Sequence, residues 1–257
     1  MPFNLKIDLH CHCREHSLCS EYPAESIAAA AVNYGLDAIA FTNHDSFMDP
    51  VLLKGLRSKF QHLKIYNCAE ISLGAEHMLY IGPFDPEIVH WNQGYEKFWR
   101  RVRENSGFLV LAHPFRFTSH VEMPVEEFPP DAIEIHSTNT GMDDEKTIAK
   151  LAEKLGVKTL CNSDGHAPKH IGIYRNIVEA GKLPEDEAAL AACLKSSTIR
   201  SEADMARIIQ HNEWVSKLET LAKECLNTGK GPLEFEAISG EWRGFYDRIK
   251  MGRSYKI

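Results

Sequence analysis

The sequence predicts an α/β fold whose strands close into a barrel. Between residues 3 and 166, short apolar stretches alternate with segments rich in helix-forming residues, which is typical of a mostly parallel sheet covered by helices. Stretch after stretch ends in His, Asp or Glu. A barrel brings the carboxyl ends of its strands to one mouth, whereas an open sheet gathers only the strands beside its switch point. With 257 residues, 44% of them hydrophobic, the chain can bury a full core.

The first expected strand covers residues 3–12 and opens with a short alternation of apolar and polar side chains. Because successive side chains of a strand point to opposite faces, His10 and His12 share one face and Cys11 and Cys13 the other. Two imidazoles about one strand repeat apart suit the binding of a divalent cation. Taken alone, the pair also fits a strand that enters a loop, so the rest of the chain has to decide.

The following elements continue the alternation. Strands are expected at residues 37–41, 63–69, 78–81, 108–112, 132–135 and 158–161. Helices are expected at residues 24–34, 51–60, 95–105 and 143–155, the first ending at Gly35, a typical helix C-terminal glycine.

Past Pro168 the pattern blurs, and residues 185–195 and 202–226 are expected to be helical. The second of these helices carries an apolar stripe that we expect to pack against the barrel. The sequence therefore predicts a barrel in residues 1–200 and a helical extension in residues 201–257. Residues 229–257 could cover the site, join an oligomer or cover the core.

Charge and cysteine usage restrict the function. A net charge of −7 argues against a general nucleic-acid binder and leaves at most a short oligonucleotide as such a ligand. No stretch approaches the ~20 apolar residues of a membrane span, and the start lacks a signal-peptide pattern, so we expect a cytoplasmic protein. The 7 cysteines suit reduced thiols. Cys11, Cys13 and Cys19 crowd the first histidine pair, where packing is expected and zinc binding or oxidation is the alternative.

Potential metal ligands stand at the expected strand ends. Singly, each could be a buried histidine with a hydrogen-bond partner or a capping carboxylate. Together they exceed what one tetrahedral ion uses, and two or three divalent ions with a bridging carboxylate account for their number. Histidine and carboxylate donors suit Zn, Mn or Fe. The set consists of His10, His12, His44, Glu70, His77, His113, Asp164 and His166.

Six short motifs in the same order resemble the polymerase-and-histidinol-phosphatase (PHP) family of metal-dependent phosphoesterases. They are Asp8-Leu-His-Cys-His12, Phe41-Thr-Asn-His-Asp45, Ala69-Glu-Ile-Ser72, His77, Leu111-Ala-His-Pro114 and Asn162-Ser-Asp-Gly-His166. The resemblance implies a distorted (β/α)7 TIM-like barrel with a trinuclear site at the carboxyl ends of the strands. It implies one metal on His10, His12, Glu70 and Asp164, a second on Glu70, His77 and His113, and a third on His44 and His166.

Two departures from the family pattern stand near the third metal position. Many members carry an Asp or a His shortly after the first histidine pair, and loop 13–20 offers no obvious match. Glu15 and His16 are the candidate replacements, so the occupancy of the third position stays open. Asn43 stands where the family usually has Asp, and we expect it to keep an orienting hydrogen bond while losing a charge.

The expected reaction is hydrolysis of a phosphate ester by metal-activated hydroxide. Adjacent divalent ions activate a water and neutralise phosphate oxygens, and we expect His44 to take part in this step. Arg116 is the candidate for a guanidinium fork on the phosphate, with a surface ion pair as the alternative. His136, Lys169 and Arg175 are further candidates for contacts with the substrate, and His136 could instead support a metal ligand.

The expected substrate is a small phosphomonoester, such as a nucleotide or a histidinol-phosphate-like metabolite. The alternatives are a 5′→3′ exonuclease or oligonucleotide phosphatase, and a non-catalytic metal-binding barrel. The acidic composition disfavours long polynucleotides, and the nearly complete ligand set disfavours an inert barrel. The sequence predicts neither the native metal nor the oligomeric state.

Overall fold

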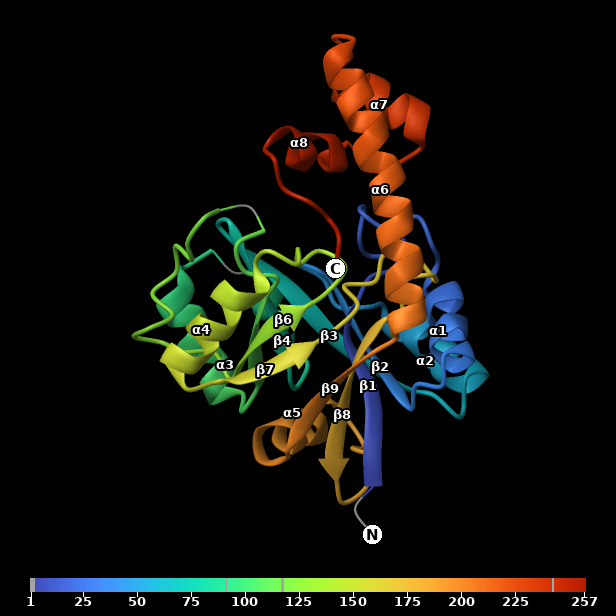
Figure 1. Ribbon diagram of the computed structural model, residues 1–257. Coiled ribbons are helices and arrows are strands. Elements are labelled where there is room, and N and C mark those ends of the chain that lie inside the picture. Colours follow the sequence, from blue (N-terminus) through green and yellow to red (C-terminus); the bar gives the residue numbers. More distant parts are fainter. Residues whose placement is uncertain (1–2, 91, 117, 242) are drawn as a thin grey trace.

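A single sheet of nine strands curls into a nearly closed barrel in the computed structural model, which describes residues 3–90, 92–116, 118–241 and 243–257 (Figure 1). The strands are β1 (Phe3–Cys11), β2 (Ala38–His44), β3 (Lys64–Leu73), β4 (Glu76–Ile81), β5 (Phe108–Ala112), β6 (Ala132–His136), β7 (Lys158–Cys161), β8 (Tyr174–Ala180) and β9 (Ile199–Ala203). The helices are α1 (Ala24–Asn33), α2 (Pro50–Lys59), the short 3₁₀ helix η1 (Ile88–His90), α3 (Tyr95–Glu104), α4 (Glu145–Leu155), α5 (Glu187–Ser196), α6 (Met205–Asn227), α7 (Pro232–Ser239) and α8 (Gly244–Lys250).

The strand order is β7-β6-β5-β4-β3-β2-β1-β8-β9, and it confirms the predicted barrel class. The expectation of a mostly parallel sheet is wrong, because β4 runs antiparallel to both neighbours and β8 to β1 and β9. Only two residues connect β3 to β4, with Gly74 at φ 69°. So short a connection makes a hairpin, since a parallel crossover needs a dozen or more residues.

The barrel closes through a side chain where regular strand pairing stops. Asn176 of β8 is fully buried. Its Nδ2 donates to the Cys161 carbonyl of β7 at 2.8 Å, and its Oδ1 accepts from the Cys161 N–H at 3.1 Å. One amide side chain therefore satisfies both backbone groups of a residue at the end of the sheet, as a neighbouring strand would.

Apolar residues of the barrel fall into layers inside and outside the sheet. The inner cluster joins alternate residues of the strands, such as Leu5, Ala40 and Val110, to α5, which covers one end of the barrel. Outside the sheet, one cluster packs β1–β3 against α1 and α2, and another packs β3–β6 against α3 and α4 (Figure 1). The interior is filled at the α5 end, so the opposite end is the one available for a site.

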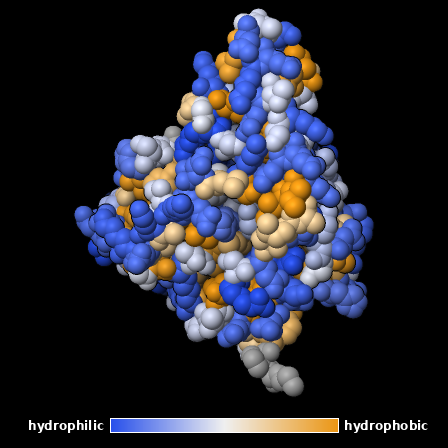
Figure 2. Space-filling model, in the orientation of Figure 1, coloured by the Kyte–Doolittle hydropathy of each residue, from blue (hydrophilic) through white to orange (hydrophobic). Residues whose placement is uncertain are grey.

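The C-terminal helices project from the barrel as an arm (Figure 1). Ile208, near the start of α6, packs against the barrel, whereas Leu218 and Ala222 pack against α7 and α8. The expected apolar stripe therefore lies mainly against the other helices of the arm and not against the barrel. The face of the arm seen in Figure 2 is mostly hydrophilic with scattered apolar residues. The sheet continues to Ala203, and the division of the chain at residue 200 stays a prediction.

The last residues of the chain return from the arm to the barrel. The Ile257 N–H donates to Asn212 of α6 at 2.9 Å, and the Lys256 carbonyl accepts from the Met142 N–H at 3.0 Å. Residues 251–257 therefore lie beside the loop that follows β6. None of the described helices combines the length and apolar character needed to cross a membrane.

Candidate metal centre

The Glu70 carboxylate at the mouth of the barrel is the centre of the predicted ligand set. Its Oε2 lies 3.2–3.3 Å from imidazole nitrogens of His10, His12 and His44. Its Oε1 lies 2.9 Å from nitrogens of His77 and His113. A carboxylate in contact with imidazoles through both oxygens has the arrangement needed to bridge two cations.

Asp164 provides a second buried carboxylate on the other side of the same imidazoles. Its Oδ1 lies 3.3 Å from His10 Nε2, 3.2 Å from His12 Nε2 and 3.5 Å from His166 Nδ1. Its Oδ2 lies 3.8 Å from His113 Nε2. The structure thus brings all eight predicted metal ligands together.

Several donor atoms of the cluster are buried without a hydrogen bond, and a divalent cation would satisfy them. His10 Nε2, His12 Nε2, Glu70 Oε2 and Asp164 Oδ1 are buried and make no hydrogen bond. Leaving such atoms unsatisfied is costly, and metal coordination is the usual way in which a buried cluster of this composition is satisfied. The donors form several groups of three or four whose ligand atoms all lie within 4.8 Å of one another, as a shared ion requires.

The imidazoles differ in protonation. Burial opposes a charge on His10 and His12, but Asp164 and Glu70 raise the pKa of both, so a metal would have to displace their protons. Burial lowers the pKa of His44 to about 3 and that of His166 to about 4, so both imidazoles are neutral. Burial would raise the pKa of Glu70, but the neighbouring His10, which holds its proton, keeps it well below its usual range. Asp164 behaves in the same way beside His10. Neutral imidazole and ionised carboxylate are the forms that coordinate a metal.

The backbone departs from regular geometry where it presents these ligands. Leu9 packs inside the barrel, whereas Cys11 packs outside against α1, and the register of β1 shifts between Asp8 and Cys11. This irregularity leaves His10 and His12 at the mouth. Cys11 and Cys13 pack in the outer cluster, as expected. His113 at φ 25° and Asp164 at φ 48° adopt conformations that non-glycine residues rarely take, which is typical of functional sites.

His77 lies at the mouth although it stands near the amino end of its strand. It is the second residue of β4, where it pairs with Ala112 of β5, next to the ligand His113. Because β4 is antiparallel to its neighbours, its amino end meets the carboxyl ends of β3 and β5.

Glu134 of β6 is a supporting residue that the sequence analysis did not identify. It is fully buried, and its Oε1 accepts hydrogen bonds from His10 Nδ1 at 3.0 Å and Asn162 Nδ2 at 2.9 Å. Its Oε2 accepts from the His113 N–H at 3.0 Å. A carboxylate behind a metal-binding imidazole fixes the orientation of the ring and raises its basicity. The available signal was a charged residue inside the apolar strand 132–135.

We expect Glu134→Gln to weaken metal binding by roughly 10–100-fold, because His10 loses the charged partner that fixes its ring. Isothermal titration of the metal-free protein with Zn²⁺ measures this change. Glu179→Gln, an exposed position on β8, is the matched control and should bind as the wild type does. Equal affinities of the Glu134→Gln variant and the wild type would show that Glu134 has no part in holding the ligands.

Glu15 and His16, the two candidates for the missing ligand of the third metal position, make hydrogen bonds elsewhere. Glu15 accepts a hydrogen bond from the Ala24 N–H at 3.0 Å, at the start of α1. His16 Nε2 accepts from the Asp49 N–H at 3.0 Å. Cys19 reaches the cluster in their place, with its Sγ 3.1 Å from His166 Nε2.

Asn43 keeps an orienting hydrogen bond, as expected, although it acts through a serine. Its Oδ1 accepts from Ser17 Oγ at 3.2 Å and from the Cys13 N–H at 3.0 Å. Ser17 Oγ in turn accepts from the His44 N–H at 3.1 Å and lies 3.3 Å from His12 Nδ1. Ser17 therefore connects Asn43 to two of the ligands.

The four predicted substrate contacts do not form one cluster. Arg116 is mostly buried, and its Nη1 lies 3.9 Å from Asp164 Oδ2, beside the centre. The other three have partners elsewhere. His136 stacks on Tyr174, Lys169 covers the Trp214 ring of α6 at 4.1 Å, and Arg175 lies in β8, where it pairs with Glu202.

Comparison with known proteins supports the fold. The chain matches no family model and no curated protein sequence. PsfC from Pseudomonas syringae has 17% identity and a TM-score of 0.59, over 82% of this chain and 97% of its own. A two-domain protein from Bacteroides vulgatus, described as containing a predicted PHP-like metal-dependent phosphoesterase, has 16% identity and a TM-score of 0.59, over 79% of this chain and 65% of its own. The resemblance to PHP proteins is thus confirmed in the fold.

Proposed function

We propose that this protein is a metal-dependent phosphoesterase that hydrolyses a small phosphomonoester. The observation that carries the proposal is the convergence of His10, His12, Glu70, His113 and Asp164 at one mouth, together with buried donor atoms that make no hydrogen bond. A structural neighbour described as containing a PHP-like phosphoesterase supports the same reaction class. We expect two or three ions of Zn, Mn or Fe to bind there.

The donor groups overlap, so each one marks residues close enough to share an ion and not a fixed division of the ligands among the ions. His10, His12 and Glu70 form one group, and Glu70 joins His44 and His77 in another. A third consists of His10, His113 and Asp164. When bound, divalent ions in such a cluster lower the pKa of a water and neutralise phosphate oxygens. The contribution of the protein is to hold ionised carboxylates and neutral imidazoles in fixed positions, through Glu134 and Ser17 among others.

The mouth is suited to an anionic substrate of limited size. Arg116 and Arg253 lie together there, since Arg253 Nη1 donates to the Arg116 carbonyl at 3.4 Å. Arg248 joins them, paired with Asp144, which also binds Arg253. Because Asp144 neutralises part of this charge, Arg116 is the guanidinium that we propose for the phosphate. The tail that carries Arg253 borders the mouth, which favours a small molecule over a long polynucleotide.

We expect Arg116→Gln to lower kcat/KM for a phosphomonoester about 10–100-fold. A hydrogen bond to a charged group is worth roughly 1.5–3 kcal/mol, and each 1.4 kcal/mol is about a tenfold change. Arg116→Lys should retain part of the activity, because it keeps the charge but loses the fork. The control is Arg100→Gln, which removes an exposed ion pair with Glu96 on α3. Unchanged kinetics of Arg116→Gln would remove this residue from the site.

Turnover of p-nitrophenyl phosphate by the purified protein, loaded with Mn²⁺ or Zn²⁺, tests the proposed function. We expect hydrolysis that is lost with a chelator and in Asp164→Asn. A parallel assay on short 5′-phosphorylated oligonucleotides separates a phosphatase of small molecules from an exonuclease. Nucleoside monophosphates and phosphorylated amino alcohols then test the substrate class. Absence of turnover with every substrate, in a protein that binds metal normally, would support the inert metal-binding barrel instead.

A further inference from the structure

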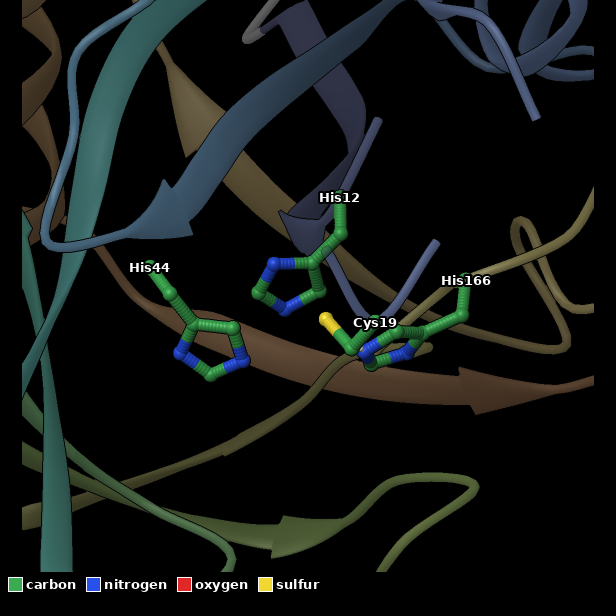
Figure 3. Close-up of side chains that lie close together, drawn as sticks. All are labelled: His12, Cys19, His44 and His166. Atoms are coloured by element: carbon green, nitrogen blue, oxygen red, sulfur yellow. Dashed lines mark hydrogen bonds between the residues drawn. The ribbon is translucent and has the colours of Figure 1, made fainter. Parts of the chain in front are cut away.

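Cys19 lies in a group of potential metal ligands that also contains His12, His44 and His166 (Figure 3). Each residue contributes one ligand atom, and these atoms all lie within 4.8 Å of one another. The Sγ atom is 3.1 Å from His166 Nε2. The His12 ring stacks between those of His44 and His166, with centroid distances of 4.7 and 4.4 Å.

His12 gives independent evidence that a cation belongs here. Its side chain is fully buried, and its Nε2 makes no hydrogen bond. The ring nitrogen on the other side, Nδ1, lies 3.3 Å from Ser17 Oγ, which fixes the orientation of the ring. An imidazole that is held in place by one nitrogen, while the other makes no hydrogen bond and lies 3.2 Å from Glu70 Oε2 and Asp164 Oδ1, has the arrangement of a metal ligand.

The loop that carries Cys19 is held in place on both sides of this residue. Before it, Ser17 bonds to Asn43 and to the His44 N–H. After it, Ser20 Oγ donates to the His166 carbonyl at 3.0 Å. Leu18, between the two serines, is fully exposed, so its own side chain does not hold this part of the loop. The hydrogen bonds fix Cys19 to the same two histidines that its sulfur faces.

We infer that Cys19 is a thiolate ligand and that it completes a metal position with His12, His44 and His166. This inference rests on the metal centre of the proposed function. When Sγ bonds to the ion, the thiol proton is released to solvent. The donors of this position are one sulfur and three nitrogens, whereas the other groups each contain Glu70 or Asp164.

The difference in donors predicts a difference in metal preference. A thiolate with imidazoles selects zinc over manganese or magnesium, which favour carboxylate and water ligands. The position that contains Cys19 should therefore take up zinc first. Cobalt(II) is a suitable probe, because it adopts zinc-like geometry and gives a sulfur-to-cobalt charge-transfer band in the near ultraviolet only when a thiolate coordinates it.

The test is cobalt titration of the metal-free protein without substrate, followed by absorbance and by elemental analysis of the bound metal. We expect the charge-transfer band in the wild type and in Cys193→Ser, a matched control on α5. Cys19→Ser should lose the band and bind one cobalt fewer per chain. Cys19→Asp should restore the metal count without the band, and it should bind manganese better relative to zinc. Circular dichroism shows whether each variant is folded.

Two results would overturn the inference: a band that persists in folded Cys19→Ser, or wild-type protein that binds cobalt without any band. Neither depends on turnover. A chain that shows the Cys19-dependent band but hydrolyses no phosphate ester would refute the proposed function and leave the thiolate ligand intact. Hydrolysis by a wild-type protein that shows no band would refute the thiolate ligand and leave the proposed function intact.

Discussion

Glu70→Gln is expected to reduce bound metal to background and to abolish phosphoesterase activity. Both oxygens of this carboxylate face imidazoles, and it belongs to two of the donor groups, so a single substitution disturbs more than one ion. Glutamine is nearly isosteric, but its amide nitrogen is a poor ligand and it lacks the charge that balances the cations. The loss should exceed the roughly 10–100-fold effect of removing a supporting partner.

Elemental analysis of the purified variant and its kcat/KM measure the two effects. Glu76→Gln is a matched control, because Glu76 is also a buried carboxylate of the β3–β4 hairpin but accepts a hydrogen bond from the Glu122 N–H. The control should bind metal normally. If Glu70→Gln kept both its metal and its activity, the carboxylate would not be a bridging ligand.

Much of the fold could be predicted because most strands are short apolar stretches. The structure contains a strand or helix at each predicted position up to α6. β8 and β9 were not predicted. In β8 the apolar pattern is interrupted by Arg175, which pairs with Glu202, and by Asn176, which closes the barrel. Both roles depend on residues distant in the sequence, so a local pattern does not reveal them.

The candidate metal ligands could be predicted because each stands at a strand end or within a recognisable motif, whereas their supporting residues could not. Glu134 supports His10 only because β6 and β1 face one another across the barrel. Cys19 reaches His166 through the conformation of a loop, which composition alone does not fix. Arg175 and Lys169 stay predicted substrate contacts, and their positions relative to the mouth depend on β8 and on the Trp214 ring of α6.

Metal binding should also stabilise the fold strongly. A ligand that binds only the folded state at a thousandfold excess over its Kd contributes about 4 kcal/mol per site. In a chain of this size each kcal/mol raises Tm by about 2–4 °C, so two occupied sites, together about 8 kcal/mol, should raise it by at least about 15 °C. The physical reason is that Glu70 and Asp164 are buried charges whose side-chain partners at the centre, among the described residues, are imidazoles, the Asn139 amide and the Arg116 guanidinium.

Thermal unfolding followed by circular dichroism, with zinc and then with an excess of chelator, measures this shift. Glu70→Gln serves as the internal control: its Tm should respond much less to the chelator, because it has lost the sites from which metal would be removed. The size of the shift separates two explanations of the buried cluster. If the wild type had the same Tm with and without metal, the imidazoles and carboxylates would stabilise one another as an ion-pair network, and their convergence would no longer support a metal centre.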